Sequence, residues 1–171
     1  MKMLTLPDDK LKITNSEMLT EYIHGGNAVL TLVGPAGTAH TYIFKCPRNS
    51  TEFPPGVRFV YVLHEDVRFY LGILDQGKFR RTMHSNFTEE AETVKGAKYI
   101  VRLASDQQLL DTTLMKLYQS GRCARCGRLL DSDASFVHGF GRKCWNIHQI
   151  KREAEASLFI KSRGGRSTSR C

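Results

Sequence analysis

Four residues near the C-terminal end of the chain have the spacing of a metal site. Cys123 and Cys126 are separated by two residues, and Cys144 and His148 follow four residues apart. The first pair can point two thiolates at one ion, and Gly127 directly after it permits the tight turn. The second pair lies on one face of a helix. Three thiolates and one imidazole form a closed tetrahedral set, so the sequence predicts a structural Zn²⁺ site.

The segment between these pairs leaves one alternative open, because His138 competes with His148 as the fourth ligand. Apolar pairs on both sides of the polar segment 131–134 predict a small hairpin before the helix that carries Cys144. Knuckle, hairpin and ligand-bearing helix in this order make a treble-clef-like module. About 26 residues cannot bury enough apolar surface to fold alone, so the metal is predicted to be part of the fold.

The two remaining cysteines lie outside this pattern. Cys46 is on the apolar face of a predicted strand and is expected in the core, whereas Cys171 at the chain end is expected to be a free thiol. The chain has 5 cysteines, an odd number, and its first residues lack the apolar core of a secretory signal. Metal ligation is therefore favoured over a disulfide framework.

The positive charge of the chain is concentrated in the same region. Residues 1–120 carry 14 basic and 13 acidic side chains, whereas residues 121–171 carry 11 basic and 4 acidic ones. This imbalance predicts a polyanionic partner, with nucleic acid as the usual candidate, although a basic end can also serve solubility alone. The predicted phosphate contacts are Arg122, Arg125, Arg128, Arg142, Lys143, Lys151 and Arg152. Phe140 and Trp145 are candidates for stacking on bases, with a core role as the alternative for Trp145.

The upstream part of the chain predicts an α+β domain built on an antiparallel β-meander with flanking helices. A helix capped by Asn15 or Ser16 is expected to end at Gly25. Five short β-rich runs follow, joined by connections too short for parallel crossovers. They are 27–33, 40–46, 57–63, 67–74 and 78–82. The predicted division of the chain is 1–119 for this domain, 120–155 for the zinc module and 156–171 for a basic flexible tail.

Two more helices are expected after the meander. Thr88 is the predicted cap of the first, whose apolar positions from Ala91 to Ala104 follow helical spacing. Ser105 is the predicted cap of the second, which is expected to end near Ser120. The second helix is predicted to carry Leu110, Leu114, Leu117 and Tyr118.

Membrane insertion and catalysis are not expected. The longest apolar run, 59–63, has 5 residues, far short of the ~20 needed to span a bilayer. No pair of candidate groups shows a nucleophile–base spacing, and no phosphate-binding glycine loop with lysine is present, so no enzymatic activity is predicted. The expected location is the cytoplasm. The sequence gives no prediction of oligomeric state.

The residues around the predicted zinc site resemble a family of uncharacterised proteins common in bacteriophages and also seen in bacteria. Its members carry a Cys-x-x-Cys-Gly-Arg-x-Leu knuckle, here 123–130, a serine matching Ser135, and a Gly-x-Gly-x-x-Cys motif, here 139–144. The family usually has proline where this chain has Arg142, which makes this motif more basic. The similarity extends loosely over 25–150. It implies zinc binding and a phage origin, hence the host cytoplasm, but no established activity.

Two functions follow as hypotheses. The first is a zinc-binding phage accessory protein that binds DNA or RNA with low sequence specificity through its basic C-terminal module, because nothing in the sequence resembles a base-reading code. The second is an inhibitor or adaptor that binds a host protein such as a polymerase, nuclease or defence complex. Charge alone does not separate them, since a host target can itself present an acidic surface.

Overall fold

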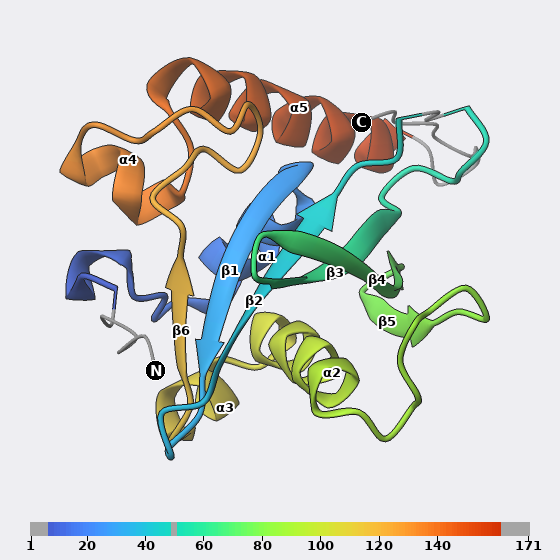
Figure 1. The fold of residues 1–171 in the computed structure, drawn as a ribbon. Helices are drawn as coiled ribbons and strands as arrows, with labels where there is room; N and C mark the ends of the chain where they lie inside the picture. Colours follow the sequence, from blue (N-terminus) through green and yellow to red (C-terminus); the bar gives the residue numbers. More distant parts are fainter. Residues whose placement is uncertain (1–6, 49–50, 162–171) are drawn as a thin grey trace.

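A six-stranded antiparallel sheet forms the centre of the molecule (Figure 1). The computed structural model describes residues 7–48 and 51–161. Strands along the sheet follow the order β5-β4-β3-β2-β1-β6, so the first five form a meander. Their bounds are β1 Asn27–Val33, β2 Ala39–Lys45, β3 Arg58–His64, β4 Val67–Asp75, β5 Lys78–Arg81 and β6 Lys116–Gln119. The predicted α+β class and the antiparallel meander are confirmed.

Alternation along the strands separates the two faces of this sheet. In β3, Val60 and Val62 are buried in the core, whereas Phe59 and Tyr61 are half-buried on the opposite face. The β3–β4 hairpin closes through Glu65 and the following aspartate, both with positive φ, as tight hairpin turns require. Period-two alternation thus directs one set of side chains inward and leaves the other set facing outward.

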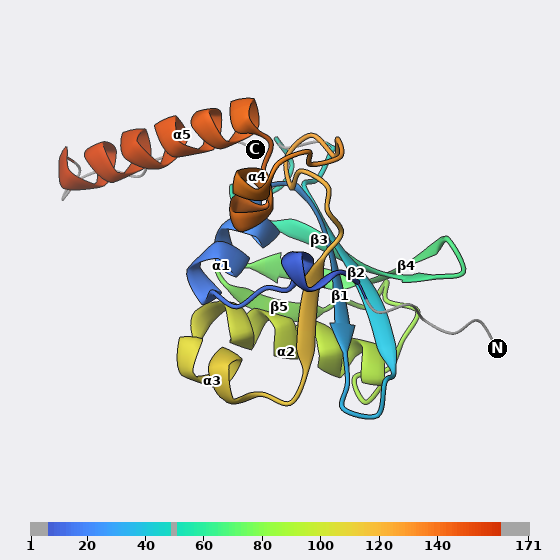
Figure 2. The ribbon, with the colours of Figure 1, turned by 90° about the vertical axis from the view of Figure 1, so that its left-hand side faces the viewer.

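Three helices cover the inner face of the sheet (Figure 2). They are α1 Ser16–His24, α2 Glu92–Ser105 and α3 Gln107–Thr112, and a short 3₁₀ turn η1, Asp9–Leu11, precedes them. Asn15 caps α1 by accepting a hydrogen bond from Met18 N–H at 2.7 Å, as predicted. The predicted side-chain cap at Thr88 is wrong, because α2 begins after Ala91 without a side-chain cap.

The long second helix predicted from Ser105 to the region of Ser120 is also wrong. Asp106 caps α3 instead, accepting from Leu109 N–H at 2.9 Å, and the helix ends at Thr112. Leu117 and Tyr118 lie in β6, which pairs antiparallel with β1. Both side chains are buried, at 2% exposure each, so tertiary pairing rather than helical periodicity decides this segment.

Two helices follow β6, α4 Asp133–His138 and α5 Arg142–Lys161. The predicted hairpin is wrong here: Ser132 caps α4 by accepting from Ser135 N–H at 3.3 Å. Gly139 ends α4 with a left-handed φ of 72°. Helix α5 continues past residue 155, where the predicted module ends, and the last part of the predicted tail, 162–171, lies outside the described residues. Among the described helices, none combines the length and apolarity needed to cross a bilayer.

Candidate metal centre

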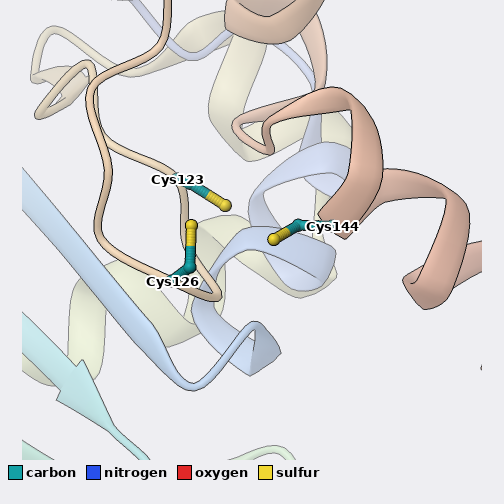
Figure 3. A group of neighbouring side chains, drawn as sticks. All are labelled: Cys123, Cys126 and Cys144. Atoms are coloured by element: carbon teal, nitrogen blue, oxygen red, sulfur yellow. The ribbon is translucent and has the colours of Figure 1, made fainter.

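Three cysteines converge where the chain leaves β6 and enters α5. The sulfur atoms of Cys123, Cys126 and Cys144 all lie within 4.8 Å of one another. Figure 3 shows the three side chains pointing toward a common centre, two from the loop after β6 and one from the first turn of α5. Thiolates at this separation suit one soft or borderline ion such as Zn²⁺, so the cluster could hold a metal.

Backbone hydrogen bonds shape the turn that holds the first two sulfurs. Cys123 N–H donates to the carbonyl of Arg128 at 2.8 Å, and Gly127 N–H donates to the carbonyl of Cys123 at 2.9 Å. Gly127 has φ 76°, the left-handed conformation expected directly after the second cysteine of a knuckle. An isolated bridge between Arg122 and Leu129 closes the base of this turn. The predicted knuckle is therefore present.

The knuckle is fixed to the domain through Ala124. This residue is fully buried. Its carbonyl accepts a hydrogen bond from Asn27 N–H at 2.7 Å, and its N–H donates to the carbonyl of Gly139 at 2.9 Å. A Cβ atom built on Gly25 would lie 2.6 Å from the Ala124 Cβ, so only glycine lets the α1–β1 turn approach this closely. The cysteine cluster is thus built against the start of the sheet rather than on a separate arm.

Ionisation differs between the sulfurs. Burial raises the pKa of the Cys123 thiol, but hydrogen bonds from the backbone N–H groups of Cys126, Gly141 and Arg125 outweigh burial and bring the pKa below its ordinary value. Burial and the neighbouring sulfurs raise the pKa of Cys144 to about 11, while Arg125 acts in the opposite direction. Three adjacent thiolates repel one another, and a divalent cation is the group that would relieve this repulsion.

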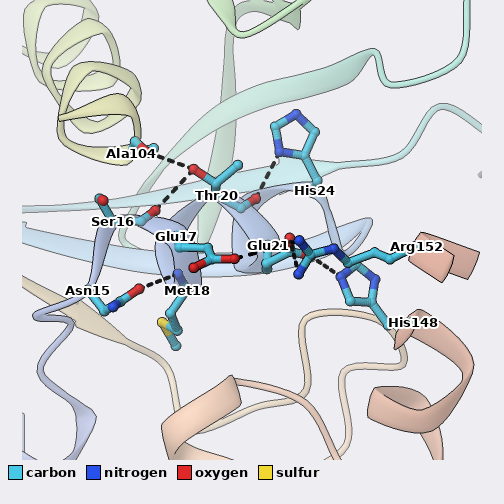
Figure 4. A network of polar contacts seen from close by, with 10 residues as sticks. All are labelled: Asn15, Ser16, Glu17, Met18, Thr20, Glu21, His24, Ala104, His148 and Arg152. Atoms are coloured by element: carbon cyan, nitrogen blue, oxygen red, sulfur yellow. Dashed lines mark hydrogen bonds and ion pairs between the residues drawn. The ribbon is translucent and has the colours of Figure 1, made fainter. Parts of the chain in front are cut away.

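Neither histidine considered as the fourth ligand belongs to the sulfur cluster. The Nε2 atom of His148 contacts the Glu21 carboxylate on α1, and its ring stacks on Phe140 with centroids 4.8 Å apart. Figure 4 shows this contact between α1 and α5. The ring of His138 stacks on Trp145 at 4.0 Å. The structure therefore brings together three of the four predicted ligands, and the identity of a fourth stays a prediction.

One family match covers this region. Residues 118–148 match DUF6011, a family of unknown function. No curated protein matches the chain significantly. No solved structure matches it either. The matched segment runs from β6 into α5 and includes all three cysteines and both candidate histidines.

All seven predicted phosphate contacts are exposed. Arg152 is already engaged, because it pairs with Glu21 at 2.9 Å and Glu17 at 3.6 Å. The guanidinium of Arg122 donates to the carbonyl of Gly127 at 3.2 Å. Among the described residues, no ion pair involves the basic side chains nearest the cluster, which are Arg125, Arg128, Arg142 and Lys143.

The two aromatic candidates for base stacking pack inside the module. Phe140 is 1% exposed, so its predicted stacking role is wrong. Trp145 is half-buried beside it, with centroids 5.7 Å apart, which fits the alternative of a core role. Cys46 is half-buried directly after β2 and is disulfide-bonded, which corrects its prediction as a core thiol. Cys171 lies outside the described residues.

Sequence reasoning missed Glu21, the carboxylate that joins α1 to α5. Its side chain is 15% exposed and contacts both His148 and Arg152. Glu17 and Glu21 lie four residues apart on one face of α1. An acidic pair on one helix face, in a chain with a basic C-terminal helix, is a signal that could have indicated this contact.

Proposed function

We propose that this chain is a zinc-stabilised accessory protein of phage origin that binds nucleic acid through the basic surface of its C-terminal module. The observation that carries the proposal is the group of exposed basic side chains beside the cysteine cluster, Arg125, Arg128, Arg142 and Lys143. Exposed cations of this kind pair with phosphates without reading sequence. A binding role is proposed rather than a catalytic one.

Zinc is the proposed metal, with His148 as the fourth ligand. Cys144 and His148 both lie on α5, one turn apart, and can reach toward the same side of that helix. The Glu21 carboxylate beside the imidazole is the type of partner that orients metal-bound histidines. Replacing zinc with Co²⁺ gives an absorption spectrum that reports the ligand set. We expect His148→Ala to change this spectrum and His138→Ala to leave it unchanged.

A salt series tests nucleic-acid binding. The metal-loaded protein is titrated with single- and double-stranded DNA and RNA at increasing salt, and the slope of log affinity against log salt is measured. We expect Arg128→Gln and Arg142→Gln each to lower that slope by about 0.7–0.9, one phosphate contact. Arg102→Gln removes one exposed arginine on α2, outside the module, and serves as the control. Absence of binding, or affinity independent of salt, would contradict the proposal.

A protein partner is the second candidate function, and exposed apolar side chains favour it. Leu129 is 70% exposed, Val137 67% and Ile150 65%, all in the same module. Apolar side chains that stay in water are typical of a surface that another molecule covers. Affinity capture from host lysate with wild type and a Leu129→Ser, Val137→Ser double variant tests it. A partner retained equally by both proteins would argue against these residues as the contact.

A further inference from the structure

The outer face of the sheet carries a group of aromatic side chains. Helices α1, α2 and α3 lie on the other side of the sheet (Figure 2). Strand pairing places Phe59 of β3 opposite Lys45 of β2, and Tyr61 opposite Tyr70 of β4. Each of these aromatic residues is half-buried, so part of each ring faces solvent. A sheet face with exposed rings on neighbouring strands is unusual for a surface without a ligand.

The rings form a connected set. Phe53, from the loop after β2, meets Phe59 edge to face with centroids 5.0 Å apart. Phe59 and Tyr70 are 6.0 Å apart, and Tyr70 and Tyr61 are 5.6 Å apart. Edge-to-face packing fixes the orientation of each ring, so the faces presented to solvent are already arranged before a ligand arrives.

A hollow of about 430 Å³ lies over these rings. The aromatic side chains of Phe53, Phe59 and Tyr61 line it. Three cations also line it, Lys45, Arg48 and Arg68, against one carboxylate, Glu52. Burial and the neighbouring Tyr70 raise the pKa of the Tyr61 hydroxyl, while the charges of Arg68 and Arg48 act against that rise. Both arginines line the same hollow as Tyr61.

Aromatic rings and cations around one hollow are the groups that bind single-stranded nucleic acid. Nucleobases stack on aromatic faces, and the phosphates on either side of a base pair with cations about one nucleotide away. An apolar peptide would leave Lys45, Arg48 and Arg68 without partners, and a duplex keeps its bases stacked inside where these rings cannot reach them. The excess of cations over the single carboxylate favours a polyanion.

We propose that this hollow on the outer face of β3 binds bases of single-stranded nucleic acid, with Tyr61 and Phe59 stacking on a base and Arg48 and Arg68 pairing with its flanking phosphates. The residues that line the site all belong to the sheet domain, and none of them belongs to the cysteine module. The site therefore gives the chain a preference for single strands that the module's phosphate contacts do not supply. Experiments can therefore disprove the single-strand site on the sheet and the phosphate-binding role of the module independently of each other.

The test measures fluorescence anisotropy of the full, metal-loaded chain with labelled oligo-dT of about 15 nucleotides and with the same length as a duplex. We expect Tyr61→Leu to weaken single-strand binding about tenfold or more and to change duplex binding less than about twofold. Tyr61→Phe keeps the ring and is expected to bind like wild type. Circular dichroism melts confirm that each variant folds.

Arg68→Gln is compared with Arg102→Gln, which removes the same charge from α2. We expect only Arg68→Gln to reduce the ratio of single-strand to duplex affinity. Equal losses on single strands and duplexes, no effect of Tyr61→Leu, an equal loss in Tyr61→Phe, or absence of single-strand binding by wild type would each overturn the proposal. If Arg128→Gln leaves all binding unchanged while Tyr61→Leu abolishes single-strand preference, the sheet site stands and the module's role fails.

Discussion

The sheet domain and the C-terminal module differ in how much apolar surface they bury. The sheet and its helices bury large side chains completely, among them Tyr42, Phe44 and Leu71. The module contributes few members to this core, Cys123, Ala124, Leu130 and Phe140. Four of the 7 large exposed apolar residues in the described chain lie in the module, Leu129, Val137, Ile147 and Ile150. A segment that leaves so much apolar surface in water needs a different source of stability, and a metal ion held by the three cysteines would provide one.

Metal removal is expected to produce the largest contrast between the two regions. A structural zinc contributes on the order of 10 kcal/mol to the folding of a small metal-binding module. A strong chelator, or Cys123→Ser, should therefore release the segment from residue 121 to α5 while the sheet keeps its structure. Hydrogen exchange resolved by residue measures this as lost protection confined to the module.

Leu71→Ala perturbs the sheet domain and is the counterpart of metal removal from the module. Leu71 is fully buried in β4, and its truncation should cost about 2–5 kcal/mol of unfolding free energy. Because the module docks on the sheet through Ala124, we expect this variant to lower protection in both regions. Chelation that leaves the module protected, or that exposes both regions equally, would refute the contrast.

Gly139→Ala tests the contact between the two regions. Gly139 has φ 72°, and a Cβ atom there would collide with the ring of Tyr22 on α1. The left-handed conformation costs a non-glycine residue about 1–2 kcal/mol, and displacing a packed ring adds about 1–3 kcal/mol. We expect the variant to lose about 2–5 kcal/mol of unfolding free energy in urea titrations of the metal-loaded protein.

Gly141→Ala is the control for this variant. A Cβ atom on Gly141 meets nothing within 4 Å, and its φ is not in the left-handed range. We expect a change below about 0.5 kcal/mol. Equal losses in the two variants would show that the Tyr22 contact does not join the module to the domain.

The sequence predicted those parts of the molecule that local patterns determine. Alternation such as Val60 and Val62 against Tyr61 was enough to place the strands of the meander, and cysteine spacing was enough to place the sulfur cluster. Strand β6 was missed because Leu117 and Tyr118 are both buried, without alternation, through pairing with β1. Helix α4 was missed because the polar residues around Ser132 are equally typical of a hairpin turn and of a helix cap.

The environment of His148 could not be predicted for a different reason. Its partner Glu21 is 127 residues away in the sequence, so no local pattern joins the two. The spacing of Cys144 and His148 shows only that they share a helix face. Which groups meet that face depends on how α5 lies against α1, and this is decided by tertiary packing.

Glu21→Gln is expected to give a smaller effect than Gly139→Ala. The carboxylate contacts His148 and lies 2.9 Å from Arg152, in a partly buried contact between α1 and α5. Hydrogen bonds to charged groups of this kind contribute about 1.5–3 kcal/mol. Glu17→Gln is the control, because Glu17 is 74% exposed and 3.6 Å from Arg152, where an ion pair contributes little. Thermal melts that show equal destabilisation in both variants would contradict a specific role of Glu21.

The smallest expected effect is a pH dependence at His24, a residue of the sheet domain. Burial lowers the pKa of His24 at the end of α1, and the charge of Arg58 acts in the same direction, while the hydrogen bond to the Thr20 carbonyl opposes them. The unfolded chain therefore binds the proton more readily than the folded one. His24 contributes full stability above the ordinary histidine pKa, and this contribution is lost as the pH falls through the folded pKa.

His24→Gln isolates this contribution, because glutamine keeps an N–H donor for the Thr20 carbonyl, which lies 2.8 Å from Nδ1, and does not titrate. Urea unfolding of the metal-loaded proteins at about pH 7.5 and about pH 5.5 gives the loss of unfolding free energy for each. Protonation of the cysteine thiols destabilises both proteins alike and cancels in the difference. We expect wild type to lose more stability than His24→Gln over this interval, with the additional unfolding seen in the sheet domain and not in the module. An equal loss in the two proteins would show that the acid sensitivity resides entirely in the metal centre.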